Sequence, residues 1–229
     1  MKVIQYNYRI SFNIVLVFQL CNRRKGDYNM FLFEEGDFSE YSKYAKLDEA
    51  AKPIMETYGD FEKTTIFISH KHDDLEDLKG VIGFLEKTYN VKVYIDSWDD
   101  SMPNNTSGIT AKKIKRKIRE CDKFILLATD GAVESKWCNW ELGFGDARKY
   151  RKNIALFPLK KKGESNNNYR GNEYMSIYPY IECRQDRDMS CRYLSPSGYY
   201  VCYKNGEIVI PLEEWFAKRG VNNYEYRYI

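Results

Sequence analysis

The sequence predicts an α/β fold with a parallel central sheet, and two observations support this class. Short apolar, β-branched runs alternate with longer segments whose apolar residues recur at helical spacing. The short runs are continuously apolar, which is typical of strands that are buried on both faces. Four such runs are expected to form strands, at residues 65–69, 91–95, 123–129 and 153–158.

Segments with helical features separate these strands, as parallel pairing requires. After the first strand, leucine and isoleucine residues at helical spacing predict a helix that Asp73 or Asp74 caps. Residues 109–119 predict a basic amphipathic helix, and residues 135–150 predict a helix with Ser135 as its N-terminal cap. Right-handed crossovers between the strands then give a flavodoxin-like, doubly wound parallel sheet.

The composition divides the chain into four regions, each with its own predicted structure. In chain order they are a basic leader, an N-terminal helical extension, the α/β domain, and a C-terminal β-hairpin with a closing helix packed on that domain. Their boundaries are residues 1–29, 30–62, 63–182 and 183–229. Two β-rich runs that flank Asn205-Gly206 predict the hairpin, and residues 211–219 predict the closing helix. A fifth strand is expected within residues 175–182.

The basic leader accounts for the positive charge of the chain. Residues 1–29 carry five lysine and arginine residues against Asp27, whereas the whole chain has a net charge of +3, so residues 30–229 carry −1. Overall charge therefore gives no support for a nucleic-acid partner. The codons for residues 24–29 can contain a ribosome-binding sequence just ahead of Met30, and we expect translation to begin at Met30.

Composition also argues against a membrane protein and a metalloprotein. No apolar run approaches the roughly 20 residues that span a bilayer, so we expect a cytoplasmic protein. The six cysteines form no CxxC pair, and His70 and His72 are the only histidines, so no metal site is expected. Reduced thiols are expected in that compartment.

Polar residues follow the predicted strands at the edge where their carboxyl ends meet. In doubly wound sheets, ligands bind beyond these ends, at the point where the strand order changes direction. Ser69 and His70 end the first strand, and Asp96, Ser97 and Trp98 follow the second. We therefore expect these side chains to line one cleft.

The helix predicted after the third strand starts from the same edge. Trp137, Glu141 and Phe144 share one of its faces, and Glu141 is the only carboxylate on that face. A carboxylate beside an indole suits a flat cationic ring and its sugar. In the alternative interpretation, Glu141 lies at a solvated helix edge, and Trp140 and Phe144 belong to the core.

Three segments in this order resemble bacterial TIR (Toll/interleukin-1 receptor) domains. They are IFISH at residues 66–70, VYIDSW at 93–98 and SKWCNWELG at 135–143. The W-C-x-x-E helix in the last segment is the specific part of the resemblance. The resemblance covers roughly residues 64–160, and it implies the flavodoxin-like fold and an NAD+-cleaving activity.

The resemblance also implies roles for individual residues. Glu141 corresponds to the essential glutamate of catalytic TIR domains, and Trp137 corresponds to a residue beside the bound dinucleotide. The implied pocket also includes Ser69, His70, Asp96 and Trp98. NAD+ is then the substrate, and no cofactor is expected. The long loop at residues 98–110 is similar to loops in TIR proteins of anti-phage systems such as Thoeris.

We therefore expect an enzyme of anti-phage immunity that turns NAD+ into an ADP-ribose or cyclic ADP-ribose signal for a downstream effector. Self-association through TIR surfaces is also expected. One carboxylate can suffice, because nicotinamide leaves as a neutral ring and needs no general acid. Two alternatives stay open at this point: a non-catalytic interaction module, and a nucleoside N-glycosidase or deoxyribosyltransferase.

Overall fold

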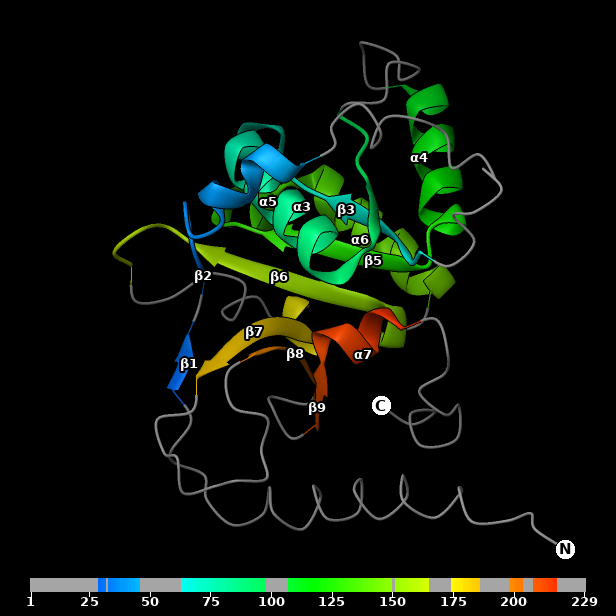
Figure 1. Cartoon of the computed structure of the whole chain (residues 1–229). Helices are drawn as coiled ribbons and strands as arrows, with labels where there is room; N and C mark the ends of the chain where they lie inside the picture. Colours follow the sequence, from blue (N-terminus) through cyan, green and yellow to red (C-terminus); the bar gives the residue numbers. More distant parts are fainter. Residues whose placement is uncertain are drawn as a thin grey trace, which may run out of the picture.

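A sheet of nine strands runs through the described part of the chain, with helices packed on both of its faces (Figure 1). The structure is a computed structural model, and it describes residues 29–31, 33–45, 63–97, 107–149, 151–164, 174–185, 198–203 and 208–217. Almost all of the predicted leader, residues 1–28, lies outside the described residues, as does Trp98.

Four parallel strands form one side of this sheet, with β4 at its edge. They are β3 (Thr65–Ser69), β4 (Lys92–Tyr94), β5 (Lys123–Ala128) and β6 (Ile154–Lys160). Their order is β4-β3-β5-β6, and each neighbouring pair is parallel, so the order changes direction between β3 and β5. This confirms the flavodoxin-like arrangement, and the predicted strand ends differ from the observed ones by at most two residues.

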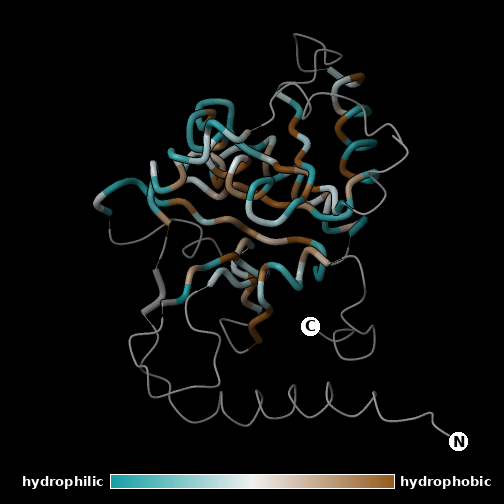
Figure 2. Tube along the Cα trace, viewed as in Figure 1, coloured by the Kyte–Doolittle hydropathy of each residue, from teal (hydrophilic) through white to brown (hydrophobic). Residues whose placement is uncertain are grey.

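Helices on the two faces of the sheet enclose two hydrophobic cores. The helical elements of this region are η2 (His72–Asp74), α3 (Leu75–Tyr89), α4 (Gly108–Glu120), α5 (Asp130–Glu134), α6 (Lys136–Lys149) and η3 (Arg151–Asn153). One core lies under α3, and the other lies under α4, α5 and α6. Figure 2 shows the hydrophobic residues gathered along the central strands. None of the helices within the described ranges combines the length and the apolarity that crossing a bilayer requires.

The prediction that Asp73 or Asp74 caps α3 is wrong. Asp74 occupies the N-cap position, but its side chain makes no cap hydrogen bond. Instead, Thr129 Oγ1 donates a hydrogen bond to Asp74 Oδ2 at 2.6 Å, and Asp73 pairs with Lys71. The Asp74 carboxylate therefore binds Thr129, which is 55 residues away in the sequence, and not the N–H groups at the start of α3.

The C-terminal strands extend the sheet beyond β6. They are β7 (Tyr180–Gln185), β8 (Gly198–Tyr203) and β9 (Ile208–Pro211), and α7 (Leu212–Phe216) follows directly. The antiparallel pairing of β8 with β9 confirms the hairpin, whose turn, residues 204–207, lies outside the described residues. The fifth strand was predicted too early: η5 (Met175–Ile177) forms a 3-10 turn, and Pro179 has no N–H for a ladder. The closing helix ends at Phe216, earlier than predicted, and residues 218–219 lie outside the described ranges.

The N-terminal extension joins the sheet rather than standing apart from it. It contains β1 (Asn29–Phe31), β2 (Phe33–Glu34) and η1 (Ser39–Tyr44). Strand β1 pairs antiparallel with β7, and β2 pairs parallel with the end of β6. Within its described residues the helical element of this extension is the 3-10 helix η1, and residues 46–62 lie outside the described residues. Phe33 stacks on Phe157 of β6 and Phe38 meets the same ring edge to face, so this segment contributes to the core under α3.

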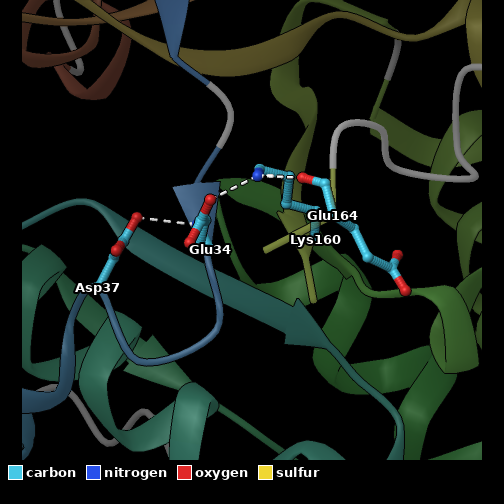
Figure 3. Close-up of polar contacts among 4 residues, drawn as sticks. All are labelled: Glu34, Asp37, Lys160 and Glu164. Carbon is cyan, nitrogen blue, oxygen red and sulfur yellow. Dashed lines mark hydrogen bonds and ion pairs between the residues drawn. The ribbon is translucent and has the colours of Figure 1, made fainter. Parts of the chain in front are cut away.

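A lysine at the end of β6 fixes this extension to the sheet (Figure 3). Lys160 Nζ donates to Glu34 Oε1 at 2.5 Å and also to the carbonyl oxygen of Glu164. On the other side of β2, Glu34 N donates to Asp37 Oδ2 at 2.8 Å. The Lys160 side chain is 11% exposed, so its charge depends on these partners for the solvation that it has lost.

Replacing Lys160 with methionine is expected to loosen β2 without unfolding the central sheet. Methionine keeps the aliphatic stem but donates to neither Glu34 nor Glu164, so the pKa of Glu34 should rise, because the Lys160 hydrogen bond is the largest cause that lowers it. Hydrogen exchange should become faster at the amides of residues 33–35 and stay slow at residues 66–68. Unchanged exchange at residues 33–35 would show that backbone pairing alone holds β2.

Candidate active site

Helix α6 carries Glu141 to the edge of the sheet where β3 ends. The helix begins as predicted, because the N–H of Cys138 donates to Ser135 Oγ at 3.3 Å. Further along, Gly145 packs on β5, and a Cβ at this position would lie 3.1 Å from the Phe124 ring. The missing side chain therefore lets α6 approach the sheet closely, which explains a glycine inside a helix.

The carboxyl group of Glu141 is buried and hydrogen-bonded to the last residue of β3. Glu141 is 2% exposed and Ser69 is 1% exposed. Ser69 Oγ donates to Glu141 Oε2 at 2.5 Å, which is a short hydrogen bond. Oε1 is also buried, and no described residue donates a hydrogen bond to it. The interpretation of Glu141 as a solvated helix edge is therefore wrong.

This environment raises the pKa of Glu141 well above its usual range. Burial is the largest cause, and the nearby charge of Asp96 raises the pKa further. The Ser69 hydroxyl opposes the rise, as does the Trp137 indole, which lies nearby without reaching hydrogen-bond geometry. A buried carboxyl group with a strongly perturbed pKa at the switch point of a sheet is a candidate catalytic group.

His70 and the residues after β4 form the other side of the site. His70 is 7% exposed, a hydrogen bond of 2.6 Å joins its Nε2 to Ser97 Oγ, and its Nδ1 lies 3.4 Å from the carbonyl oxygen of Ile68. Burial lowers the pKa of His70 below 6.5, and the charge of Asp96 opposes this effect. The two hydrogen-bond partners fit a neutral ring that carries its proton on Nδ1.

The buried His70 is expected to make the fold less stable in acid. Because its pKa is lower in the folded chain, the unfolded chain binds a proton more readily, and stability falls as the pH drops below 6.5. His70→Gln removes this contribution, so the free energy of unfolding of the variant should depend less steeply on pH between 7 and 5.5. Urea unfolding at several pH values measures this, and parallel pH curves for the two proteins would contradict the assignment.

Three aromatic side chains of α6 form a stack that packs against the second core. Trp137 stacks on Trp140 with ring centroids 4.8 Å apart, and Trp140 stacks on Phe144 at 6.3 Å. Lys115 of α4 lies over both Trp140 and Phe144. Trp140 and Phe144 are partly buried against the second core, so the interpretation that they belong to the core is correct in part. Of the three rings in this stack, Trp137 is the one that lowers the pKa of Glu141.

The structure thus brings most of the predicted site residues to one edge of the sheet. Glu141 accepts a hydrogen bond from Ser69, and its pKa responds to Asp96 and Trp137. The charge of Asp96 also affects the pKa of His70. Trp98 lies outside the described residues. Ser97, which was expected to line the cleft but was given no role in binding the substrate, is the hydrogen-bond partner of His70.

The cysteines of the described residues show no sign of reactivity. Cys138 lies one turn before Glu141 and is 1% exposed, and burial raises the pKa of its thiol to about 11. A raised pKa disfavours the thiolate, which is the reactive form. Within the described ranges, no group of three or more His, Cys, Asp or Glu residues is arranged to hold a metal ion.

Comparison with known proteins identifies the family of this chain. A protein of Bacillus cereus (strain MSX-D12), named "Probable 3' cyclic ADP-D-ribose synthase ThsB'", is 28% identical over 165 residues, which cover 66% of this chain and 83% of that protein. The sequence profile of the TIR domain matches residues 66–192. This match includes β3, Glu141 and the start of the C-terminal strands, and it covers more than half of the chain. The chain therefore belongs to the TIR domain family.

Proposed function

We propose that this protein cleaves NAD+ at the bond between nicotinamide and ribose and forms a cyclic ADP-ribose signal in defence against phages. The observation that carries the proposal is the buried carboxyl group of Glu141, held by Ser69 at the switch point of a TIR sheet. The similarity to a protein named as a cyclic ADP-ribose synthase supports the same reaction class.

The chemistry needs one carboxylate and no metal. The bond between the ribose carbon and the nicotinamide nitrogen breaks, its electron pair goes to the nitrogen, and nicotinamide leaves as a neutral ring. Positive charge develops on the ribose, as in glycoside hydrolysis. The Glu141 carboxylate stabilises this charge in a site with a low dielectric constant, where one charge has a large effect. A nucleophilic atom of the same molecule then forms a bond to the ribose carbon and loses a proton. The new bond closes the ring.

Neighbouring residues bind the substrate around this carboxylate. The face of Trp137 holds a flat ring beside Glu141, and Asp96 and His70 line the site beyond the ends of β4 and β3. Asp96 adds negative charge next to the developing cation. It also raises the pKa of Glu141, so the same charge both helps the reaction and disfavours the ionised form of the catalytic group.

The described conformation is a resting state. Both oxygens of a carboxylate that is 2% exposed are inaccessible to a substrate, so residues around Glu141 must move before NAD+ can reach it. Self-association through TIR surfaces, triggered by infection, is the proposed cause of this movement. The cyclic product then acts on a separate effector protein.

Metabolites of infected cells test the proposal most directly. Cells that express the wild-type chain should lose NAD+ after infection and accumulate nicotinamide and a cyclic ADP-ribose isomer, detected by chromatography and mass spectrometry. Cells with Glu141→Gln should keep their NAD+. Intact NAD+ in infected wild-type cells, together with direct binding to another TIR domain, would instead favour a non-catalytic interaction module.

A further inference from the structure

The two oxygens of the Glu141 carboxyl group have different surroundings. Oε2 accepts the hydrogen bond from Ser69 Oγ at 2.5 Å, whereas Oε1 receives none from the described residues. Ser69 is the last residue of β3 and pairs in register with Leu126 of β5, so the central sheet fixes its backbone. With 1% of Ser69 exposed, its hydroxyl cannot turn to solvent.

Few groups surround this carboxyl group, and among those described none is cationic. Trp137 and Cys138 lie on α6 itself, Ser69 and the neutral ring of His70 lie at the end of β3, and Asp96 follows β4. No lysine or arginine among the described residues forms an ion pair with Glu141. Ser69 is therefore the one described group that donates a hydrogen bond to the carboxylate.

We infer that Ser69 is a positioning residue for the proposed reaction: its hydroxyl holds Oε2 and leaves Oε1 directed at the ribose. This inference rests on the proposed function, but it assigns Ser69 a role other than contact with the substrate. A hydrogen bond to one oxygen fixes the plane of the carboxyl group, whose last torsion has only broad intrinsic preferences. The same bond favours the ionised form, because a hydroxyl donates more strongly to a carboxylate than to a neutral acid.

Removal of the hydroxyl is expected to change the ionisation of Glu141. In Ser69→Ala, burial and Asp96 still raise the pKa of Glu141, and the opposing hydrogen bond is gone, so the pKa rises further. At neutral pH a smaller fraction of the protein carries the carboxylate, and kcat/KM for NAD+ should fall about tenfold to a hundredfold. The acid limb of the pH–rate profile should move to higher pH, while KM changes little.

Three variants of the full chain test this inference. Ser69→Ala should shift both the pH–rate profile and the NMR titration of the Glu141 carboxyl carbon to higher pH. Ser69→Thr keeps a hydroxyl and should titrate close to wild type. Thr65→Val is the matched control, because Thr65 starts the same strand and its hydroxyl also donates to a carboxylate, Asp122 Oδ2, at 2.8 Å. This control should leave the titration of Glu141 unchanged.

The outcomes separate this inference from the proposed function. A raised KM with an unchanged titration in Ser69→Ala would overturn the inference, since Ser69 would then contact the substrate rather than position Glu141. An unshifted NMR titration overturns it even if the protein proves inactive. If the titration of Glu141 shifts in Ser69→Ala but the wild-type protein never consumes NAD+ during infection, the proposed function is rejected, while the control of the carboxyl group by Ser69 is upheld.

Discussion

Glu141→Gln is expected to reduce NAD+ cleavage by roughly a hundredfold to a thousandfold or more, the range found when one group that stabilises transition-state charge is removed. Glutamine has nearly the same volume, and its carbonyl oxygen can still accept the hydrogen bond from Ser69. What it lacks is the negative charge for the ribose cation. Loss of nicotinamide release at saturating NAD+ measures the effect, and turnover at the wild-type rate in the folded variant would reject Glu141 as the catalytic group.

The same substitution is expected to leave the fold as stable as before or more stable at neutral pH. The folded chain binds the Glu141 proton more tightly than the unfolded chain, in which the pKa of this glutamate is near 4.5. The contribution of Glu141 to the stability of the fold therefore decreases as the pH rises above 4.5 toward its pKa in the folded chain. Glutamine has no such dependence. The difference in the free energy of unfolding between variant and wild type should therefore grow from pH 5 to pH 8.

Glu134→Gln is the matched control for both measurements. Glu134 ends α5, next to α6, and it is exposed. Its neutralisation should change neither NAD+ cleavage nor the pH dependence of stability. If Glu141→Gln were less stable than wild type at pH 8, a partner would have to stabilise the charge of the buried carboxylate. Burial would then not raise the pKa of Glu141 as stated.

Gly83→Ala is expected to have the largest effect on stability, with a loss of about 1–3 kcal/mol or more from overpacking. A Cβ at Gly83 would lie 2.0 Å from the carbonyl oxygen of Tyr41, and one at Gly80 would lie 2.6 Å from that of Phe38. These atoms belong to the backbone of the N-terminal extension and cannot swing away as a side chain can. Either α3 or the extension must therefore shift.

Gly143→Ala provides the contrast within α6. A Cβ at Gly143 meets only the Tyr174 hydroxyl, at 3.5 Å, which is an ordinary contact. Alanine should stabilise the helix at this position by up to about 1 kcal/mol. Urea unfolding of both variants measures the difference, and a Gly83→Ala variant as stable as Gly143→Ala would show that the extension does not press on α3.

Some features of the fold could be predicted because they depend on local patterns. Continuous β-branched runs predicted β3 to β6, and Asn205-Gly206 predicted the hairpin of β8 and β9. Two predictions failed, one because of a distant contact and the other because of a proline beside the strand. Thr129 donates a hydrogen bond to Asp74, so Asp74 does not cap α3. Strand β7 begins only after Pro179. This proline is visible in the sequence, but the apolar pattern around it suggested an earlier strand.

The sequence by itself determined the order of strands and helices and the presence of a carboxylate beside an indole on the helix after the third strand. Only the tertiary structure decided the state of that carboxylate. Ser69 and Glu141 are 72 residues apart, and their contact exists because β3 pairs with β5 and α6 packs closely over these strands. Burial and the raised pKa follow from that packing, since desolvation depends on everything that surrounds a group and not on its neighbours in the chain.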